Sequence, residues 1–345
     1  MGSEVLDTCG MWDATWDLPE QMERAVEASY DVPDLPTLPD IEHVVVLGMG
    51  GSGVAGDVLT ATAGPFIPVP VVVSKSYNVP AFVGENTLVF AISFSGNTEE
   101  TLESAEIAAA QGARIVAVTS GGELADRAAG WGAPVISVPD TIPQPRAALG
   151  AMAVPPLLVL ESIGLFPGAH NWVQLAVEQL RDRRERLQRP GNEAERLAKR
   201  IGRTIPLVYG GASLGAVAAT RWKTQLNENA KIPAFANTHP EACHNEISGW
   251  GQHGDLTRQV FTVVNLRHDG EHPQISRRFE LVDDLVDEVA ASVHHIEADG
   301  DGLVAQLFDL IMIGDVTSLY LAAQEGLDPG PVPVLTDLKH SLAGS

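Results

Sequence analysis

The stretch that decides the fold is His-Val-Val-Val-Leu-Gly-Met-Gly-Gly-Ser-Gly, residues 43–53. Its first half is rich in β-branched residues and is typical of a buried strand, and its second half is a glycine turn that fits between a strand and a helix. Apolar strands that alternate with helices predict a parallel sheet with both faces covered. Further short apolar segments, each bounded by Gly, Pro or Ser, alternate with helical patterns at 69–73, 87–92, 114–118 and 134–138.

The same order recurs in the second half of the chain. Pro-Leu-Val-Tyr-Gly-Gly-Ala-Ser-Leu-Gly, residues 206–215, again indicates a strand, a glycine turn with a serine, and a helix. We interpret the pattern as two copies of one α/β unit. Coincidence is the alternative, because every α/β protein contains several strand–glycine–helix turns. The predicted division is an N-terminal helical extension, 1–40, a first domain, 41–170, and a second domain, 171–345.

The composition excludes some classes of partner. The 345 residues include 22 Lys and Arg against 45 Asp and Glu, a formal charge of −23. This argues against binding to nucleic acid or to an anionic membrane surface, although one cleft rich in N–H donors could still take an anion. With two cysteines, the fold does not depend on a disulfide framework. The apolar stretch 303–323 contains Asp309 and Asp315 and predicts a buried helix, so we expect a cytoplasmic protein without a membrane span.

Residues Gly48 to Gly53 match the GxGxxG pattern of dinucleotide-binding turns. Such a site would want an acidic residue after the next strand to hold a ribose, and Ser74-Lys75-Ser76 stands there instead. An NAD site is therefore disfavoured, while an NADP site stays open. A tight turn that serves packing alone is the other alternative.

A second polar turn favours phosphate. Ser93, Ser95 and Thr98 place three hydroxyls around Gly96, where a predicted strand leads into a helix. Hydroxyls and free backbone N–H groups at a helix N-terminus bind anions without a lysine. Capping of the helix by Asn97 or Thr98 is the simpler alternative, but it explains one hydroxyl and not three.

Together these segments resemble a family. Gly-Met-Gly-Gly-Ser-Gly at 48–53, Ser-Phe-Ser-Gly-Asn-Thr-Glu-Glu-Thr at 93–101 and Pro-Arg-Ala-Ala-Leu-Gly at 145–150 resemble the sugar-isomerase (SIS) domain family, in its bifunctional phosphoglucose/phosphomannose isomerase branch. The resemblance implies an α/β fold of two SIS-type units, each a parallel sheet flanked by helices in three layers. It implies a homodimer that needs no metal or other cofactor and binds a sugar 6-phosphate through Gly50, Gly51, Ser52, Ser93, Ser95 and Thr98.

Aldose–ketose isomerisation needs a base that moves a proton between C1 and C2 and a positive group that stabilises the enediolate. The resemblance assigns the base to Glu228, which lies between Asn227 and Asn229. From the residues alone, Glu228 could equally be a solvated acid at a helix end. The resemblance gives the stabilising role to Arg146, for which a salt bridge at the start of a helix is the alternative.

Ring opening needs a group that moves a proton between O1 and O5. The resemblance assigns this step to His244, reaching the active site of the partner subunit, with assistance from Lys339. A surface histidine and a lysine of a frayed tail are the alternatives. A metal site is a further one, formed by His244 with His239, Cys243 and His253. The other histidines, His268 with His272 and His294 with His295, are interpreted as surface pairs.

We therefore expect a metal-independent enzyme that interconverts glucose 6-phosphate, mannose 6-phosphate or both with fructose 6-phosphate through a cis-enediolate. A non-catalytic SIS protein that binds a phosphosugar and regulates another process is the main alternative. Such a protein would keep the hydroxyls of 93–98 but would not need Glu228 or His244. An NADP-dependent reductase would depend on the GxGxxG match alone. The preferred epimer stays open, because Gly330-Pro-Val-Pro-Val334 has no hydroxyl where relatives often have Pro-Thr-Pro.

Overall fold

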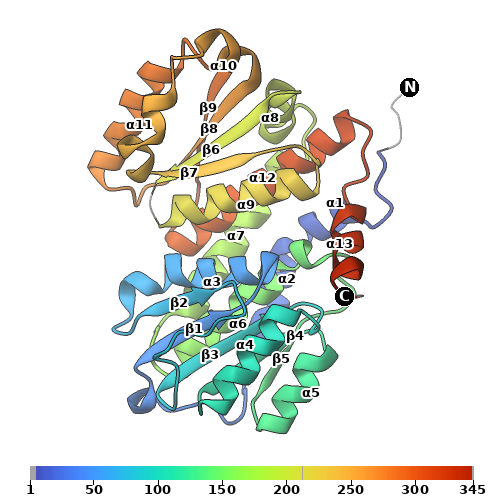
Figure 1. Ribbon diagram of the computed structural model, residues 1–345, viewed down its shortest axis with the longest axis vertical. Coiled ribbons are helices and arrows are strands. Elements are labelled where there is room, and N and C mark those ends of the chain that lie inside the picture. The colour runs from blue at the N-terminus through green and yellow to red at the C-terminus, as the bar shows by residue number, and fades with distance from the viewer. Residues whose placement is uncertain (1–4, 212, 344–345) are drawn as a thin grey trace. The chain divides into compact units, whose positions relative to one another are not determined.

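The computed structural model describes residues 5–211 and 213–343 (Figure 1). The chain forms two compact units. The first, called here the N-terminal unit, comprises Trp16–Arg183 and Ala298–Asp309. The second, the C-terminal unit, comprises the segment before Trp16, Arg184–Glu297 and the chain from Leu310 onward.

The N-terminal unit is built on a five-stranded parallel sheet with the order β2-β1-β3-β4-β5. The stretch at 43–53 forms β1 and the first turn of α3, as predicted. The chain leaves β1 for β2 on one side and returns to β3 on the other, so the sheet has its switch point between β1 and β3, where open α/β sheets bind ligands. The strands are β1 (His43–Leu47), β2 (Val71–Ser74), β3 (Thr87–Ser93), β4 (Arg114–Thr119) and β5 (Val135–Ser137).

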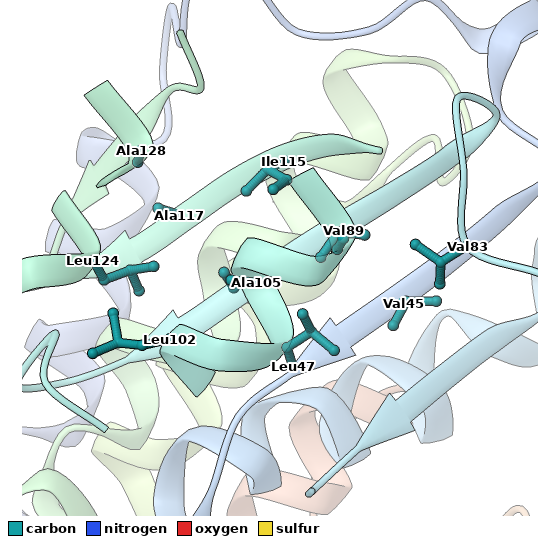
Figure 2. Close-up of a cluster of buried hydrophobic side chains, with 12 residues drawn as sticks. Val45, Leu47, Val83, Val89, Leu102, Ala105, Ile115, Ala117, Leu124 and Ala128 are labelled. Carbon is teal, nitrogen blue, oxygen red and sulfur yellow. The ribbon is translucent and has the colours of Figure 1, made fainter. Parts of the chain in front are cut away.

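Helices cover both faces of this sheet, which confirms the predicted three layers. Figure 2 shows one face, where Leu102 and Ala105 of α4 and Leu124 of α5 pack on Val89 and Leu47 of the sheet. On the other face, α3 lies so close to β1 that a Cβ on Gly56 would come within 2.9 Å of Val46. The helices of this unit are α2 (Leu18–Ala28), α3 (Gly50–Thr62), α4 (Glu99–Ala110), α5 (Gly122–Trp131), α6 (Leu149–Ser162) and most of α7 (Ala169–Leu187), with short 3₁₀ turns η1 (Leu38–Asp40), η2 (Gly64–Phe66) and η3 (Pro145–Ala147).

The C-terminal unit repeats the arrangement with a four-stranded parallel sheet in the order β7-β6-β8-β9 (Figure 1). The inner strand is again followed by an edge strand and then by its other neighbour, so the prediction of two similar α/β units is confirmed. Its elements are α1 (Met11–Trp16), α8 (Glu193–Ile201), β6 (Ile205–Gly211), α9 (Leu214–Glu228), β7 (Phe235–His239), η4 (Glu241–His244), η5 (Glu246–Gly249), α10 (Gly254–Val260), β8 (Phe261–Arg267), α11 (Pro273–Val286), β9 (Ser292–Glu297), most of α12 (Leu303–Gln324) and α13 (Pro333–Ala343).

Helix α12 is long and apolar enough to cross a membrane by length and composition, but 89% of its apolar window is buried inside the structure. Its two acids are both buried in two-pronged ion pairs. Arg183 donates to Asp309 over 2.7 and 2.6 Å, and Arg221 donates to Asp315 over 3.0 and 2.6 Å. Paired in this way, the two carboxylates are compatible with a core helix.

Candidate active site

The glycine turn before α3 lies at the carboxyl end of β1. Gly50 has a φ of +53°, and a Cβ on Gly51 would lie 3.2 Å from the carbonyl oxygen of Pro145, so this turn closely approaches η3. The Ser52 hydroxyl donates to the sulfur of Met152 over 3.3 Å and accepts from the backbone N–H of Phe94 over 3.4 Å. Ser52 therefore joins α3 to α6 and to the end of β3.

The hydroxyl loop follows β3. Ser93 is fully buried, and its Oγ is 2.9 Å from Oγ1 of Thr98. Thr98 occupies the N-cap position of α4 without a side-chain capping bond, and Asn97 Oδ1 accepts instead from the backbone N–H of Glu123 over 3.0 Å. The alternative that these side chains serve only to cap α4 is therefore wrong. Ser95 is exposed, and its Oγ accepts from the N–H of Asn97 over 3.2 Å.

Gly96 fixes this loop against the turn between β4 and α5. It has a φ of +68°, and a Cβ there would lie only 1.8 Å from the carbonyl oxygen of Gly121. The Gly96 carbonyl accepts from the N–H of Leu124 over 2.9 Å, and the Gly96 N–H donates to the Ser93 carbonyl over 3.1 Å. Glycine is required here for its backbone conformation and for the close approach.

Arg146 is the buried cation of this region. It lies in η3, is 4% exposed, and donates to Oε1 of Gln144 over 3.3 Å. Its Cα would be 3.4 Å from a Cβ on Gly51, so Arg146 borders the glycine turn. Within the N-terminal unit, the structure thus places Gly50, Gly51 and Ser52 beside η3 and the end of β3, where the predicted hydroxyls begin.

A second cation at this edge of the sheet was not predicted from the sequence. Lys75, which had only counted against a dinucleotide site, lies over α3, with its Cε 3.0 Å from where a Cβ on Gly53 would be. Its ammonium forms an ion pair with Asp57 of α3. Burial raises the pKa of the Asp57 carboxyl, and the Lys75 ammonium partly opposes that rise. No local sequence signal pairs these residues, because they lie on different elements.

In the C-terminal unit, Glu228 is the last residue of α9 and is half-buried. The amides on either side of it are anchored: Asn227 donates to the carbonyl of Ile232 over 2.9 Å, and the fully buried Asn229 donates to Oγ of Ser318 over 2.9 Å. The turn that carries the Glu228 carboxylate is therefore fixed from both sides.

Lys231 joins this turn to the segment before α13. Its Nζ donates to the carbonyls of Glu228 over 3.3 Å and Asn229 over 3.4 Å, and to the carbonyl of Asp328 over 2.6 Å. A cation at the carboxyl end of a helix satisfies carbonyls that the helix leaves unpaired. The following helix, α13, carries Lys339 on an exposed position.

His244 is exposed at the end of η4. Of the residues considered with it as metal ligands, His239 is fully buried, and its Nδ1 lies 3.2 Å from Sγ of Cys243. Burial lowers the pKa of His239. In the chain that the structure describes, no group of three or more His, Cys, Asp or Glu side chains is arranged to hold a metal ion. His268, expected on the surface, is only 8% exposed, so that interpretation was wrong.

Comparisons with known proteins agree with the fold of two similar α/β units described above. The model of the bacterial phospho-glucose isomerase C-terminal SIS domain matches residues 191–342, and the SIS domain model matches residues 37–131. A bifunctional phosphoglucose/phosphomannose isomerase of Caldicellulosiruptor bescii is 37% identical over 96% of this chain and 99% of its own length. The chain belongs to this family. The GxGxxG match at 48–53 thus lies inside a SIS domain.

Two other similar proteins have names that describe different activities. A D-glucosamine-6-phosphate 4-epimerase of Sulfolobus acidocaldarius is 29% identical over 90% of this chain and 93% of its own. The C-terminal domain of glucosamine-fructose-6-phosphate aminotransferase from Francisella tularensis superposes with a TM-score of 0.71 at 16% identity, covering 93% of this chain and 98% of that one. The second comparison supports the fold alone.

Proposed function

We propose that this protein is a metal-independent isomerase that interconverts glucose 6-phosphate, mannose 6-phosphate or both with fructose 6-phosphate through a cis-enediolate. The proposal is based on one observation. The glycine turn of α3 and the hydroxyl loop after β3 lie side by side at the switch point of a SIS-domain sheet. The curated relative from Caldicellulosiruptor bescii, which bears the name of this activity, aligns with nearly the whole chain.

The phosphate is bound at the carboxyl ends of β1 and β3 in this proposal. A dianion at a helix N-terminus is stabilised by the unpaired N–H groups and by the helix dipole. The backbone of the glycine turn and the loop hydroxyls supply donors without the cost of desolvating several lysines. Anchoring the phosphate far from C1 and C2 uses its binding energy to orient the reacting carbons. The proposed phosphate-binding residues are Gly50, Gly51, Ser52, Ser93, Ser95 and Thr98.

The proton transfer between carbons is assigned to Glu228. Its carboxylate removes the proton from C2 of the open-chain aldose, and the electron pair released forms the enediolate. The carboxylate then returns the proton to C1 while the proton on O2 moves to O1, which leaves the ketone at C2. The anchored amides of Asn227 and Asn229 support this role, because a base must be held within reach of both carbons. The guanidinium of Arg146 stabilises the negative charge that develops on the oxygens.

Ring opening is assigned to His244, because an imidazole has one nitrogen that donates a proton and one that accepts a proton, and can therefore move a proton between O1 and O5. We propose that the working form is a homodimer in which His244 of the partner subunit completes each active site, and the exposure of this side chain supports that arrangement. Lys339 assists ring opening or binds the sugar. We further propose a cytoplasmic protein with the division 1–40, 41–170 and 171–345.

The test is a coupled assay of the purified protein with glucose 6-phosphate and mannose 6-phosphate, in buffer containing EDTA. We expect fructose 6-phosphate from at least one of them, and in heavy water we expect deuterium to enter the product. Glu228→Gln should retain substrate binding and lose about 10²–10⁴-fold in kcat. Glu185→Gln changes an exposed carboxylate of α7 and serves as the matched control.

Three results would overturn different parts of the proposal. Wild-type turnover by Glu228→Gln would reject Glu228 as the base. Absence of any hexose 6-phosphate isomerisation would reject the activity, and conversion of glucosamine 6-phosphate at C4 in the same samples would place this chain with its epimerase relative. Loss of activity on chelation would reject metal independence.

A further inference from the structure

Glu246 follows His244 by two residues and is the first residue of the 3₁₀ turn η5. It accepts a hydrogen bond from the hydroxyl of Tyr209 on β6 and another from Nδ2 of Asn237 on β7 over 2.6 Å. Tyr209 is fully buried. Two neighbouring strands of the sheet therefore hold one carboxylate of the 3₁₀ turn η5.

Tyr209 is suited to be the permanent donor of this cluster. Burial raises the pKa of its phenol far above the ordinary value of 10.0, and the neighbouring Glu246 carboxylate raises it further. The phenol thus keeps its proton throughout the neutral range. The hydrogen bond from Tyr209 therefore ties Glu246, the first residue of η5, to strand β6.

The backbone around His244 is held on both sides. Before it, Ala242 is buried in the apolar cluster that Tyr209 and Phe279 form on this face of the sheet. After it, Oδ1 of Asn245 accepts from the N–H of Glu246 over 2.6 Å. The exposed imidazole has little packing of its own, so its position depends on the backbone that carries it. An acid–base group must be held to within about 0.5 Å of its working position.

We propose that Glu246 is a positioning residue for His244, and that its cluster with Tyr209 and Asn237 governs the opening of the sugar ring while the proton transfer between C1 and C2 is left unaffected. This inference rests on the proposed function. If Glu246 acts on ring opening alone, its loss should affect substrates that are cyclic in solution and spare those that are open-chain. A hexose 6-phosphate is mostly cyclic and must be opened, whereas a tetrose 4-phosphate stays open-chain because the oxygen that would close its ring is esterified.

The experiment compares glucose 6-phosphate with erythrose 4-phosphate in the full-length protein. In Glu246→Gln the side-chain oxygen still accepts the hydrogen bond from Tyr209. The new amide nitrogen faces the amide nitrogen of Asn237, so the hydrogen bond from Asn237 is lost. We expect kcat/KM for glucose 6-phosphate to fall about 10–100-fold, the usual effect of removing a partner that orients a reactive group. For erythrose 4-phosphate we expect a change of less than about twofold, because ring opening is bypassed. His244→Ala should give the same selective pattern.

A double variant tests the hydrogen bond itself. In Glu246→Gln with Asn237→Asp, the glutamine nitrogen donates to the new carboxylate, which exchanges donor and acceptor and restores the pair. We expect the double variant to recover most of the glucose 6-phosphate activity. A second measurement is the affinity for 5-phosphoarabinonate, an acyclic anion that mimics the enediolate, which should stay within about twofold of wild type in every variant.

The outcomes separate the inference from the function on which it rests. Equal losses on both substrates, a tenfold loss of 5-phosphoarabinonate affinity, or no effect of Glu246→Gln on glucose 6-phosphate would each overturn the positioning role. A wild-type protein inactive on both substrates would instead overturn the proposed function. If the wild type opens hexoses but rejects the tetrose, the affinity for 5-phosphoarabinonate and the double-variant rescue decide the matter.

Discussion

Replacement of Gly96 by alanine should displace the hydroxyl loop after β3, which we propose binds the phosphate. The added Cβ would lie 1.8 Å from the carbonyl oxygen of Gly121, whereas such contacts are essentially never shorter than 3.0 Å, so one of the two groups must move by about 1.2 Å. The φ of +68° adds about 1–2 kcal/mol for a residue with a Cβ. Overpacking of this kind costs a further ~1–3 kcal/mol.

The functional effect should exceed the effect on stability. A misplacement of about 1 Å in a substrate-positioning group costs on the order of 10²-fold in rate, so we expect Gly96→Ala to lower kcat/KM for hexose 6-phosphates by about that factor, mostly through KM. Unfolding in urea and steady-state kinetics on the same preparation measure the two effects. Gly130→Ala is the matched control, because it lies on the exposed side of α5 with nothing within 4 Å of the new methyl group.

The control should be as stable as the wild type or about 0.5–1 kcal/mol more stable, since alanine favours a helix over glycine. Wild-type KM and stability in Gly96→Ala would refute the reasoning, because they would mean that the loop absorbs the methyl group without moving the hydroxyls.

Asp315→Ala should lower the free energy of unfolding by about 3–5 kcal/mol, because it leaves the guanidinium of Arg221, which is 2% exposed, without its carboxylate; a loss below about 1 kcal/mol in urea would contradict this. Asn229→Ala removes an amide beside the proposed base, and kcat should fall while the affinity for inorganic phosphate is unchanged; a weaker phosphate affinity at constant kcat would be the wrong pattern. Burial lowers the pKa of His239 and His268 below the ordinary 6.5, so the unfolded chain binds more protons and stability declines as the pH falls below about 6.5. A urea midpoint that increases on acidification from pH 7.5 to 5.5 would exclude this.

The sequence predicted the strands of the first sheet better than the edge strands of the second. Strand β1 is apolar from Val44 to Leu47 because helices cover both of its faces, and such runs are easily recognised. Strands β7 and β9 lie at the two edges of their sheet and read Phe-Ala-Asn-Thr-His and Ser-Val-His-His-Ile-Glu. These two edge strands are only partly buried and contain polar residues, so they lack a continuous apolar run and neither was predicted. Strand β2 is also an edge strand, but it keeps three consecutive valines and was predicted.

The candidate site shows a similar division. The hydroxyl loop was predicted because its three hydroxyls follow one another along the chain. The bonds from Lys231 to Asp328 and from Tyr209 to Glu246 join residues 97 and 37 positions apart, and a single sequence carries no signal that pairs them. The residues that we propose bind phosphate or move protons were therefore visible in the sequence, whereas the contacts that hold them in place could be seen only in the fold.

The carboxylate of Asp328 accepts from the hydroxyl and the backbone N–H of Thr8, and from the N–H of Gly330 over 3.0 Å. The side chain of Cys9 packs closely against Gly330. A Cβ on Gly330 would lie 2.6 Å from both Cβ and Sγ of Cys9. Thr8 and Cys9 thus hold the segment that leads into α13 in place. A substitution of Thr8 that removes these bonds should therefore loosen the segment before α13, which lies more than three hundred positions further along the chain.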